Sequence, residues 1–356
     1  MPGLHLEIQE NVSLAPFTTL GVGGPARFFV VIRSEHELLE AVAFAKANHL
    51  GLFTLGGGSN LLVADRGFPG LVLHLTLTFP ISSTAGPHHI NLLVPAGLDW
   101  DTLVLHTCTL GLSGMECLAG IPGLVGGSPI QNIGAYGQEV AQTILTVRAF
   151  DLQTGTFTEL SNEACRFTYR SSLFNTQARE RYIVTAVTFR LSPEARPNLT
   201  YADLAKHFAG QQPTPLEVYY AVREIRRTKG MLLVPGDPDS RSAGSFFKNP
   251  VVLTRQLDDL ARSLALDPAE IPHWPAPSIG TGSRVKLAAA WLIERAGFAK
   301  GFTLGNAGIS SQHTLALINR GDATYADLIA LRARIRSEVQ SRFNITLEQE
   351  PVELGT

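Results

Sequence analysis

Two glycine-rich segments constrain the fold of this chain more than any other feature. The first, residues 56–60 (GGGSN), follows a short apolar run that is typical of a strand. The second, residues 120–137 (GIPGLVGGSPIQNIGAYG), has too much glycine for a packed helix or strand and too much pattern for a linker. Glycine adopts positive φ at little cost, so such segments can surround an anion with backbone N–H groups. Either segment alone is most often a tight turn, but the pair favours a cradle for a pyrophosphate-bearing cofactor.

The sequence around these segments alternates between strand and helix patterns. Runs rich in β-branched, leucine and aromatic residues predict strands at 26–32, 51–55, 61–63, 70–75, 143–150, 156–160 and 182–191. A capping-box pattern at Ser34 and Glu37 predicts a helix after the first strand, and a second helix is expected at 99–110. The chain therefore reads as a mixed αβ protein.

The C-terminal part is richer in predicted helices. Residues 192–197 contain two prolines among polar neighbours and form the best candidate linker. Apolar spacing beyond it predicts helices at 215–229, 252–265, 283–296 and 324–343. The last of these begins with Thr324 as a predicted N-cap and carries one continuous apolar face.

Composition excludes several classes of protein. Lys and Arg total 29 against 31 for Asp and Glu, a net charge of −2. The chain therefore lacks the excess of basic residues that is typical of a nucleic-acid-binding protein. Cys108, Cys117 and Cys165 form an odd set without a CxxC pair, so neither a zinc site nor a disulfide framework is expected. The first ten residues do not resemble a signal peptide, and no apolar run approaches the roughly 20 residues of a membrane span. A soluble cytoplasmic protein is expected.

Several catalytic motifs are absent from the sequence. No Walker A motif exists because the chain has no Gly-Lys pair, and there is no HExxH zinc motif. Residues 111–115 (GLSGM) miss the nucleophile elbow of serine hydrolases by one glycine. P-loop enzymes, zinc proteases and serine hydrolases are therefore disfavoured.

Three polar residues stand out as reactive candidates, each beside a simpler interpretation. Ser245 lies between a glycine and two phenylalanines, with Lys248 and Asn249 as nearby donors; an ordinary turn serine is the alternative. Arg170 can bind a carboxylate with two parallel hydrogen bonds, or it forms a surface salt bridge. Glu350 is most simply an exposed carboxylate near the end of the sequence.

Seven segments, in order along the chain, resemble the UDP-N-acetylenolpyruvoylglucosamine reductases of bacterial peptidoglycan synthesis. The matching segments are NVSLAPFTTLGVGGPAR (11–27), LGGGSNLLVAD (55–65), GIPGLVGGSPIQNIGAY (120–136), YRSSLF (169–174), GSFFKNP (244–250), KLAAAWLIERAG (286–297) and LEQEPV (347–352). Each segment alone is weak evidence, whereas seven in the family's order are specific.

The resemblance implies an α+β fold made of an FAD-binding unit followed by a substrate-binding domain. The FAD-binding unit is of the vanillyl-alcohol-oxidase (PCMH) type, with subdomains expected at 1–75 and 76–192. The αβ substrate-binding domain is expected at 198–356, and its last segment, about 344–356, brings a glutamate to the active site.

The resemblance also implies a reaction. It is the NADPH-dependent, FAD-mediated reduction of UDP-N-acetylglucosamine enolpyruvate, with hydride added at C3 and a proton at C2, to give UDP-N-acetylmuramate. The expected partners are therefore small molecules, with no nucleic acid or membrane, and a monomer is expected. Two alternatives remain: another PCMH-type FAD oxidase or dehydrogenase, and a non-catalytic flavin- or nucleotide-sugar-binding protein.

The residues that match the family's functional positions form three groups, and none of them is a metal ligand. The catalytic group is Arg170, Ser245 and Glu350, with Glu348 as the competitor of Glu350 and with either Lys229 or Lys248 supporting the serine. The substrate-binding group is Tyr169, Tyr201, Lys229 and Asn249, of which Tyr201 belongs to a segment that resembles the tyrosine loop of the first family type. The cofactor-binding group is Gly56, Gly57, Gly58, Ser59, Asn60, Gly120, Ile121, Pro122, Gly123, Gly126, Gly127, Gln131, Asn132, Gly134, Ala135 and Tyr136.

Overall fold

The chain folds into two compact units, each built from discontinuous segments. The computed structural model describes residues 6–279 and 282–356, so the first five residues of the predicted first subdomain lie outside it. Unit 1 contains the chain up to Ser13, Pro25–Gly58 and Phe68–Thr228; unit 2 contains Leu14–Gly24, Ser59–Gly67 and Lys229–Thr356. The predicted division at 75, 192 and 198 stays a prediction.

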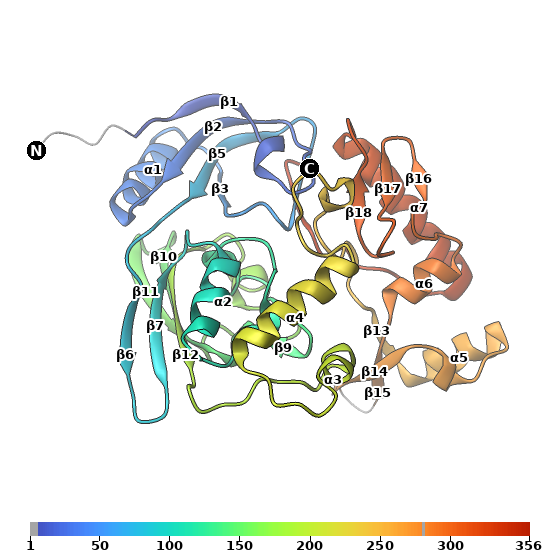
Figure 1. Ribbon diagram of the computed structural model, residues 1–356. Coiled ribbons are helices and arrows are strands. Elements are labelled where there is room, and N and C mark those ends of the chain that lie inside the picture. Colours follow the sequence, from blue (N-terminus) through green and yellow to red (C-terminus); the bar gives the residue numbers. More distant parts are fainter. Residues whose placement is uncertain (1–5, 280–281) are drawn as a thin grey trace, which may run out of the picture. The chain divides into compact units, whose positions relative to one another are not determined.

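The first sheet of unit 1 has four strands in the order β1-β2-β5-β3 (Figure 1). These strands are β1 (Gln9–Ser13), β2 (Pro25–Ile32), β3 (Leu52–Leu55) and β5 (Phe68–Leu75). β2, β5 and β3 run parallel, whereas β1 is antiparallel to β2. Helix α1 (Glu35–Ala47) buries Leu38, Ala41 and Ala45, and its N-cap Ser34 accepts a hydrogen bond from the Glu37 N–H, as the capping pattern predicts.

The second sheet of unit 1 is antiparallel and has five strands in the order β11-β10-β12-β7-β6. These strands are β6 (Ser82–Ala85), β7 (Ile90–Pro95), β10 (Ile144–Asp151), β11 (Thr156–Ser161) and β12 (Tyr182–Leu191). Its core is shared with helices α2 (Trp100–Thr109), α3 (Ala202–Phe208) and α4 (Pro215–Thr228). The second glycine-rich segment contains a 3₁₀ turn at Val125–Gly127 and the short strand β8 (Gly134–Ala135), which pairs with β9 (Gln138–Glu139) just beyond it.

The predicted linker does not separate the helices that follow it from unit 1. Leu204 and Phe208 of α3, and Val218 and Val222 of α4, are buried in the same core as the five-stranded sheet. These apolar faces need a partner surface, and they find it in unit 1. Residues 198–228 therefore belong to unit 1, although the sequence analysis groups them with the substrate-binding domain.

The described residues of unit 2 form three small sheets and three α-helices. β13 (Val251–Leu253), β14 (His273–Ile279) and β15 (Gly282–Leu287) form one sheet, with α5 (Thr254–Leu264) packed on β13 and β15. β16 (Thr303–Leu304), β17 (Ala307–Ile309) and β18 (Leu317–Asn319) form another, which α7 (Tyr325–Phe343) covers, with α6 (Ala289–Arg295) beside α7. β4 (Leu61–Val63) pairs in parallel with β19 (Val352–Leu354).

One predicted helix is wrong in its first half. The expected helix at 283–296 is strand β15 up to Leu287 and helix α6 from Ala289. Val285 and Leu287 are buried while Arg284 and Lys286 are less so, which is the two-residue alternation of a strand. β15 is the central strand of its sheet, and pairing on both sides outweighs the helix-like composition.

Helix α7 matches its prediction closely. Thr324 is its N-cap, and the Thr324 hydroxyl and the Asp327 carboxylate form the reciprocal capping box. The buried face contains Leu328, Leu331, Ile335, Val339 and Phe343.

No helix in the described part of the chain combines the length and the apolar character that crossing a lipid bilayer requires.

Candidate functional site

The two glycine-rich segments meet in unit 1. A Cβ atom added to Gly57 would lie 2.7 Å from the Gly123 Cα, so the two backbones touch and leave no space for a side chain. The Gly123 carbonyl also accepts a hydrogen bond of 3.0 Å from the Trp100 N–H, which ties this point to the start of α2. Two loops that are separate in the sequence therefore form one glycine-lined surface.

Other glycines of this surface have no packing reason to be glycine. A Cβ on Gly56 or on Gly127 would meet no protein atom within 4 Å, and neither residue has a positive φ. At Gly56 the missing side chain leaves the backbone open to a ligand, which is what a pyrophosphate-bearing cofactor requires. The Gly127 N–H donates to the Leu124 carbonyl at 3.0 Å, so at Gly127 the missing side chain leaves space rather than a free donor. This part of the site fits FAD. Gly126 differs, because its Cβ would lie 2.7 Å from the Ala96 Cβ.

Three of the predicted site residues have a left-handed backbone although they are not glycine. φ is +47° at Asn132, +48° at Tyr136 and +53° at Arg170. Such a conformation costs about 1 kcal/mol or more per residue, and it persists where the surrounding structure holds it in place. For Asn132, the Oδ1 accepts from the Ala141 N–H at 3.1 Å and the Nδ2 donates to the Thr168 carbonyl at 3.0 Å.

Arg170 lies in a tight turn directly against the second glycine-rich segment. The turn is closed by hydrogen bonds between Thr168 and Ser171, and the Arg170 Nη2 donates to the Gly134 carbonyl at 2.7 Å. The guanidinium also lies over the Tyr169 ring, at 5.6 Å from the ring centre. The predicted catalytic arginine and a predicted cofactor-binding residue are therefore neighbours in unit 1.

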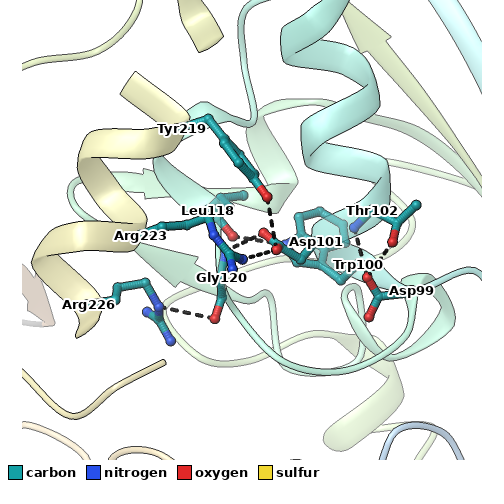
Figure 2. Close-up of polar contacts among 9 residues, drawn as sticks. All are labelled: Asp99, Trp100, Asp101, Thr102, Leu118, Gly120, Tyr219, Arg223 and Arg226. Atoms are coloured by element: carbon teal, nitrogen blue, oxygen red, sulfur yellow. Dashed lines mark hydrogen bonds and ion pairs between the residues drawn. The ribbon is translucent and has the colours of Figure 1, made fainter. Parts of the chain in front are cut away.

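The start of the second glycine-rich segment is held from both sides by helices α2 and α4 (Figure 2). The Gly120 N–H donates to the Asp101 Oδ1 at 2.6 Å, and the Gly120 carbonyl accepts from the Arg226 Nε at 3.1 Å. Asp101 in turn accepts from the Tyr219 hydroxyl and forms an ion pair with Arg223. None of these four side chains is predicted from the sequence, because α2 and α4 are more than 100 residues apart and share no motif.

The end of the segment contacts α4 and the predicted tyrosine loop. Burial raises the pKa of Tyr136 to about 12, and a hydrogen bond with Arg226 opposes that shift. The Tyr136 and Tyr201 rings meet edge to face, with centres 5.2 Å apart. The Asn198 Nδ2 donates to the Gly137 carbonyl at 3.4 Å. Tyr201 is 40% exposed, so its ring remains available to a ligand.

In unit 2, the predicted catalytic serine and glutamate lie on adjacent extended segments. The Glu350 N–H donates to the Phe246 carbonyl at 2.9 Å, and Phe247 pairs with Gln349 in a β-bridge. The Phe246 N–H donates to the Leu315 carbonyl at 2.8 Å on the other side. Ser245 follows directly on Gly244, whose φ is +69°, so a bend places it at the end of this pairing. Its hydroxyl makes no hydrogen bond to the described residues.

The environments of Glu348 and Glu350 differ. The Glu348 side chain is 75% exposed and lies 3.6 Å from the Lys248 Nζ, whereas Glu350 is half-buried. Glu350 is fixed further by Asn60, whose Nδ2 donates to the Glu350 carbonyl at 3.4 Å. The choice between Glu348 and Glu350 as the catalytic carboxylate stays a prediction.

The remaining predicted residues of unit 2 have structural contacts as well. The Asn249 Oδ1 accepts from the Ala289 N–H at 2.9 Å and so begins α6, which leaves its NH₂ group to donate elsewhere. Lys229 lies near His313, and burial first, then Lys229 and Lys300, lower the pKa of His313 to about 4.

The predicted site residues divide between the two units. Gly56–Gly58, residues 120–136, Tyr169, Arg170 and Tyr201 belong to unit 1; Ser59, Asn60, Lys229, Ser245, Asn249 and Glu350 belong to unit 2. No cluster of His, Cys, Asp and Glu among residues 6–279 and 282–356 has an arrangement that can hold a metal ion.

Comparison with known proteins identifies the family. The profile of an FAD binding domain matches residues 26–161, and that of the UDP-N-acetylenolpyruvoylglucosamine reductase C-terminal domain matches residues 237–354. The reductase of Thermobifida fusca is 46% identical over 353 residues, which are 97% of this chain and 98% of the relative. The chain belongs to the UDP-N-acetylenolpyruvoylglucosamine reductase family. The reductase of Streptomyces coelicolor is 42% identical over 100% of this chain and 93% of its own length.

The family's solved structures support the same assignment. The crystal structure of the reductase from Thermus caldophilus covers 98% of this chain and 99% of its own, with a TM-score of 0.65 and 28% identity. The predicted fold class, an FAD-binding unit followed by a further αβ domain, is therefore confirmed. The protein is an FAD-dependent oxidoreductase of peptidoglycan synthesis.

Proposed function

We propose that this protein reduces UDP-N-acetylglucosamine enolpyruvate to UDP-N-acetylmuramate with electrons from NADPH. The observation that carries the proposal is the similarity to the Thermobifida fusca reductase along 97% of the chain. Bound FAD, reduced by NADPH, would supply the hydride that adds to C3 of the enolpyruvyl group. The residues proposed to hold FAD are those of the two glycine-rich segments that meet at Gly57 and Gly123.

Arg170 and Glu350 are proposed to stabilise the charge that develops on the substrate. The enolpyruvyl double bond is conjugated with a carboxylate, so addition at C3 moves negative charge onto C2 and the carboxylate oxygens. Arg170 is a permanent cation with several donors in one plane, and one of them already bonds to Gly134. Glu350, in its protonated form, can donate a hydrogen bond to the same oxygens.

Ser245 is proposed to deliver the proton to C2. Its position on a bend next to the Glu350 segment, with a hydroxyl that bonds to no described residue, supports this role. A serine hydroxyl is a weak acid, so a cation or a water chain has to support it. Lys229 and Lys248 are both candidates; Lys248 already lies beside Glu348, at 3.6 Å.

The segment around Tyr201 is proposed to be the tyrosine loop of the first family type. Tyr201 stands at the N-cap of α3, and its exposed ring rests on Tyr136. Contacts of Asn198 with Gly137 join this loop to the end of the second glycine-rich segment. Tyr201, with Tyr169, Lys229 and Asn249, is proposed to bind the nucleotide-sugar substrate. A monomer and a cytoplasmic location stay predictions.

Anaerobic absorbance of the flavin band tests the proposal. Addition of NADPH should bleach the band, and subsequent addition of UDP-N-acetylglucosamine enolpyruvate should restore it. The same titration with NADH measures the preference for NADPH. Bleaching without recovery would mean that the substrate is a different oxidant. If NADPH did not bleach the band, the proposed reductant would be wrong.

A further inference from the structure

Asp101 is the junction between the second glycine-rich segment and helix α4 (Figure 2). It lies in the first turn of α2 and uses both carboxylate oxygens. The Oδ1 accepts from the Gly120 N–H at 2.6 Å, and the Oδ2 accepts from the Tyr219 hydroxyl at 3.0 Å and from the Arg223 Nη1. A carboxylate has an acceptor site for each of these three hydrogen bonds, and the bond from Arg223 is charge-assisted.

Helix α4 reaches both backbone groups of Gly120. Tyr219 and Arg223 are four residues apart, so they lie on one face of α4, and the Arg223 guanidinium is 5.6 Å from the centre of the Tyr219 ring. Together they hold Asp101, which accepts from the Gly120 N–H. One turn further along, Arg226 donates to the Gly120 carbonyl at 3.1 Å. The first residue of the segment is thus fixed on its donor side and on its acceptor side.

The charges around Gly120 also depend on Asp101. Burial lowers the pKa of Arg226. The nearby Tyr136 and Asp101 oppose this shift, whereas the positive charges of Arg223 and Arg170 add to it. The three arginines therefore lie close enough to repel one another, and Asp101 offsets part of that repulsion. Loss of its charge would leave Arg223 without its ion-pair partner and would loosen the helix that holds Gly120.

Gly120 is a position at which a small displacement matters. Its φ is +69°, so it begins the segment with a sharp change of direction. Three residues later, Gly123 touches Gly57 of the other glycine-rich segment. A change in the backbone direction at Gly120 would therefore displace Gly123 from its contact with Gly57.

We propose that Asp101 is a positioning residue for FAD binding: its ionised carboxylate, held by Tyr219 and Arg223, sets the direction of the second glycine-rich segment. The proposal rests on the function proposed above, specifically on the assignment of that segment to FAD. Asp101 acts through Gly120 and needs no contact with FAD itself.

The decisive variant is Asp101→Asn, because an amide cannot replace the carboxylate in this network. Either orientation of the amide points an NH₂ group at an obligate donor: the Gly120 N–H in one, the Arg223 guanidinium in the other. Loss of a charge-assisted hydrogen bond of this kind corresponds to roughly a tenfold to hundredfold change in a binding constant. Asp101→Glu keeps the charge and should remain within about threefold of the wild-type affinity.

Asp99→Asn is the matched control. Asp99 is the N-cap of the same helix, and its Oδ1 accepts from the Thr102 N–H and hydroxyl, both at 2.8 Å. The variant makes the same chemical change two residues away; its amide oxygen can still cap α2, and its side chain has no hydrogen bond to Gly120. Any effect of removing a negative charge from the start of α2, without a loss of contact to Gly120, should therefore appear in this control.

The experiment measures FAD affinity and folding separately. Each full-length variant is stripped of flavin, its thermal unfolding is recorded, and FAD is titrated while flavin fluorescence is followed. We expect Asp101→Asn to raise the Kd for FAD at least tenfold, and Asp99→Asn to leave it unchanged. Equal FAD affinity of Asp101→Asn and wild type would overturn the proposal, and so would equal losses in the two variants.

The variant could fail to fold, or the wild-type protein could fail to bind FAD, and each outcome has its own consequence. If Asp101→Asn does not fold, Tyr219→Phe removes a single donor to Asp101 and should raise the Kd by about threefold; an unchanged Kd in that variant would also overturn the proposal. If the wild-type protein itself fails to bind FAD, the proposed function fails rather than the role of Asp101.

Discussion

Substitution of Gly57 by alanine tests whether the two glycine-rich segments meet as described. The new Cβ would lie 2.7 Å from the Gly123 Cα and 3.2 Å from its carbonyl carbon. Ordinary contacts between such atoms begin near 3.4 Å, so one backbone has to move by several tenths of an ångström. Since both atoms on the other side belong to the main chain, no side chain can rotate away to make space.

The expected effects of Gly57→Ala follow from this geometry. Overpacking at a rigid contact costs about 1–3 kcal/mol, so the free energy of unfolding of the flavin-free protein should fall by that amount. The displaced segments should also bind FAD about tenfold or more weakly. Urea denaturation followed by circular dichroism measures the first quantity, and titration with FAD measures the second.

Gly56→Ala is the matched variant, because a Cβ there meets no protein atom within 4 Å. Its stability should be unchanged or raised by about 0.4–1 kcal/mol, since alanine loses less entropy on folding. FAD affinity should nevertheless fall, because the methyl group fills space left for the cofactor. If Gly57→Ala matched the wild type in both stability and affinity, the contact with Gly123 would be wrong. If Gly56→Ala kept full FAD affinity, Gly56 would not face the cofactor.

Three further predictions concern unit 2. Ser245→Ala should abolish turnover while flavin reduction by NADPH continues at the wild-type rate; loss of both would indicate a structural role. Glu350→Gln should lower turnover by about 100-fold or more, and Glu348→Gln by less than about twofold, because the second side chain is exposed; the opposite ranking would exchange their roles. The lowered pKa of His313, about 4 against 6.5 in the unfolded chain, makes the unfolded chain bind more protons between these values. Stability linked to His313 is therefore complete above pH 6.5 and is lost as the pH falls towards 4. Urea denaturation at pH 7 and pH 4 measures how much the free energy of unfolding falls between the two. In His313→Gln this fall should be smaller by up to about 3 kcal/mol than in the wild type; an unchanged pH dependence would contradict the assignment.

The elements that sequence patterns predict well are those with a local cause. The strand at 182–191 and the helix that Thr324 begins have the predicted bounds to within a residue, because a β-branched and apolar run and a capping box act within a few positions. The segment 283–296 has an even, helix-like composition, and only its place between two partner strands makes its first half a strand. That information lies in residues 251–253 and 273–279, not in the segment itself.

The same distinction applies to the site. Glycine-rich loops are visible in the sequence because the backbone conformation they need restricts the residue type locally. Their meeting at Gly57 and Gly123, and the network of Asp101 with α4, depend on tertiary contacts between distant segments. An aspartate in the first turn of a helix and an arginine on another helix each have an ordinary explanation, so neither attracts notice before the fold is known.

The pairing of β4 with β19 has a consequence for the order in which the protein can fold. Contacts such as that between Asn60 and Glu350 join residues 290 positions apart. During synthesis, β4 emerges from the ribosome early and must wait for almost the whole remaining chain before its partner exists. Meanwhile its apolar residues Leu61, Leu62 and Val63, all buried in the finished protein, stay exposed. A ribosome-bound chain that stops before residue 350 should therefore leave this segment open to proteases and chaperones, even where the first sheet has already formed.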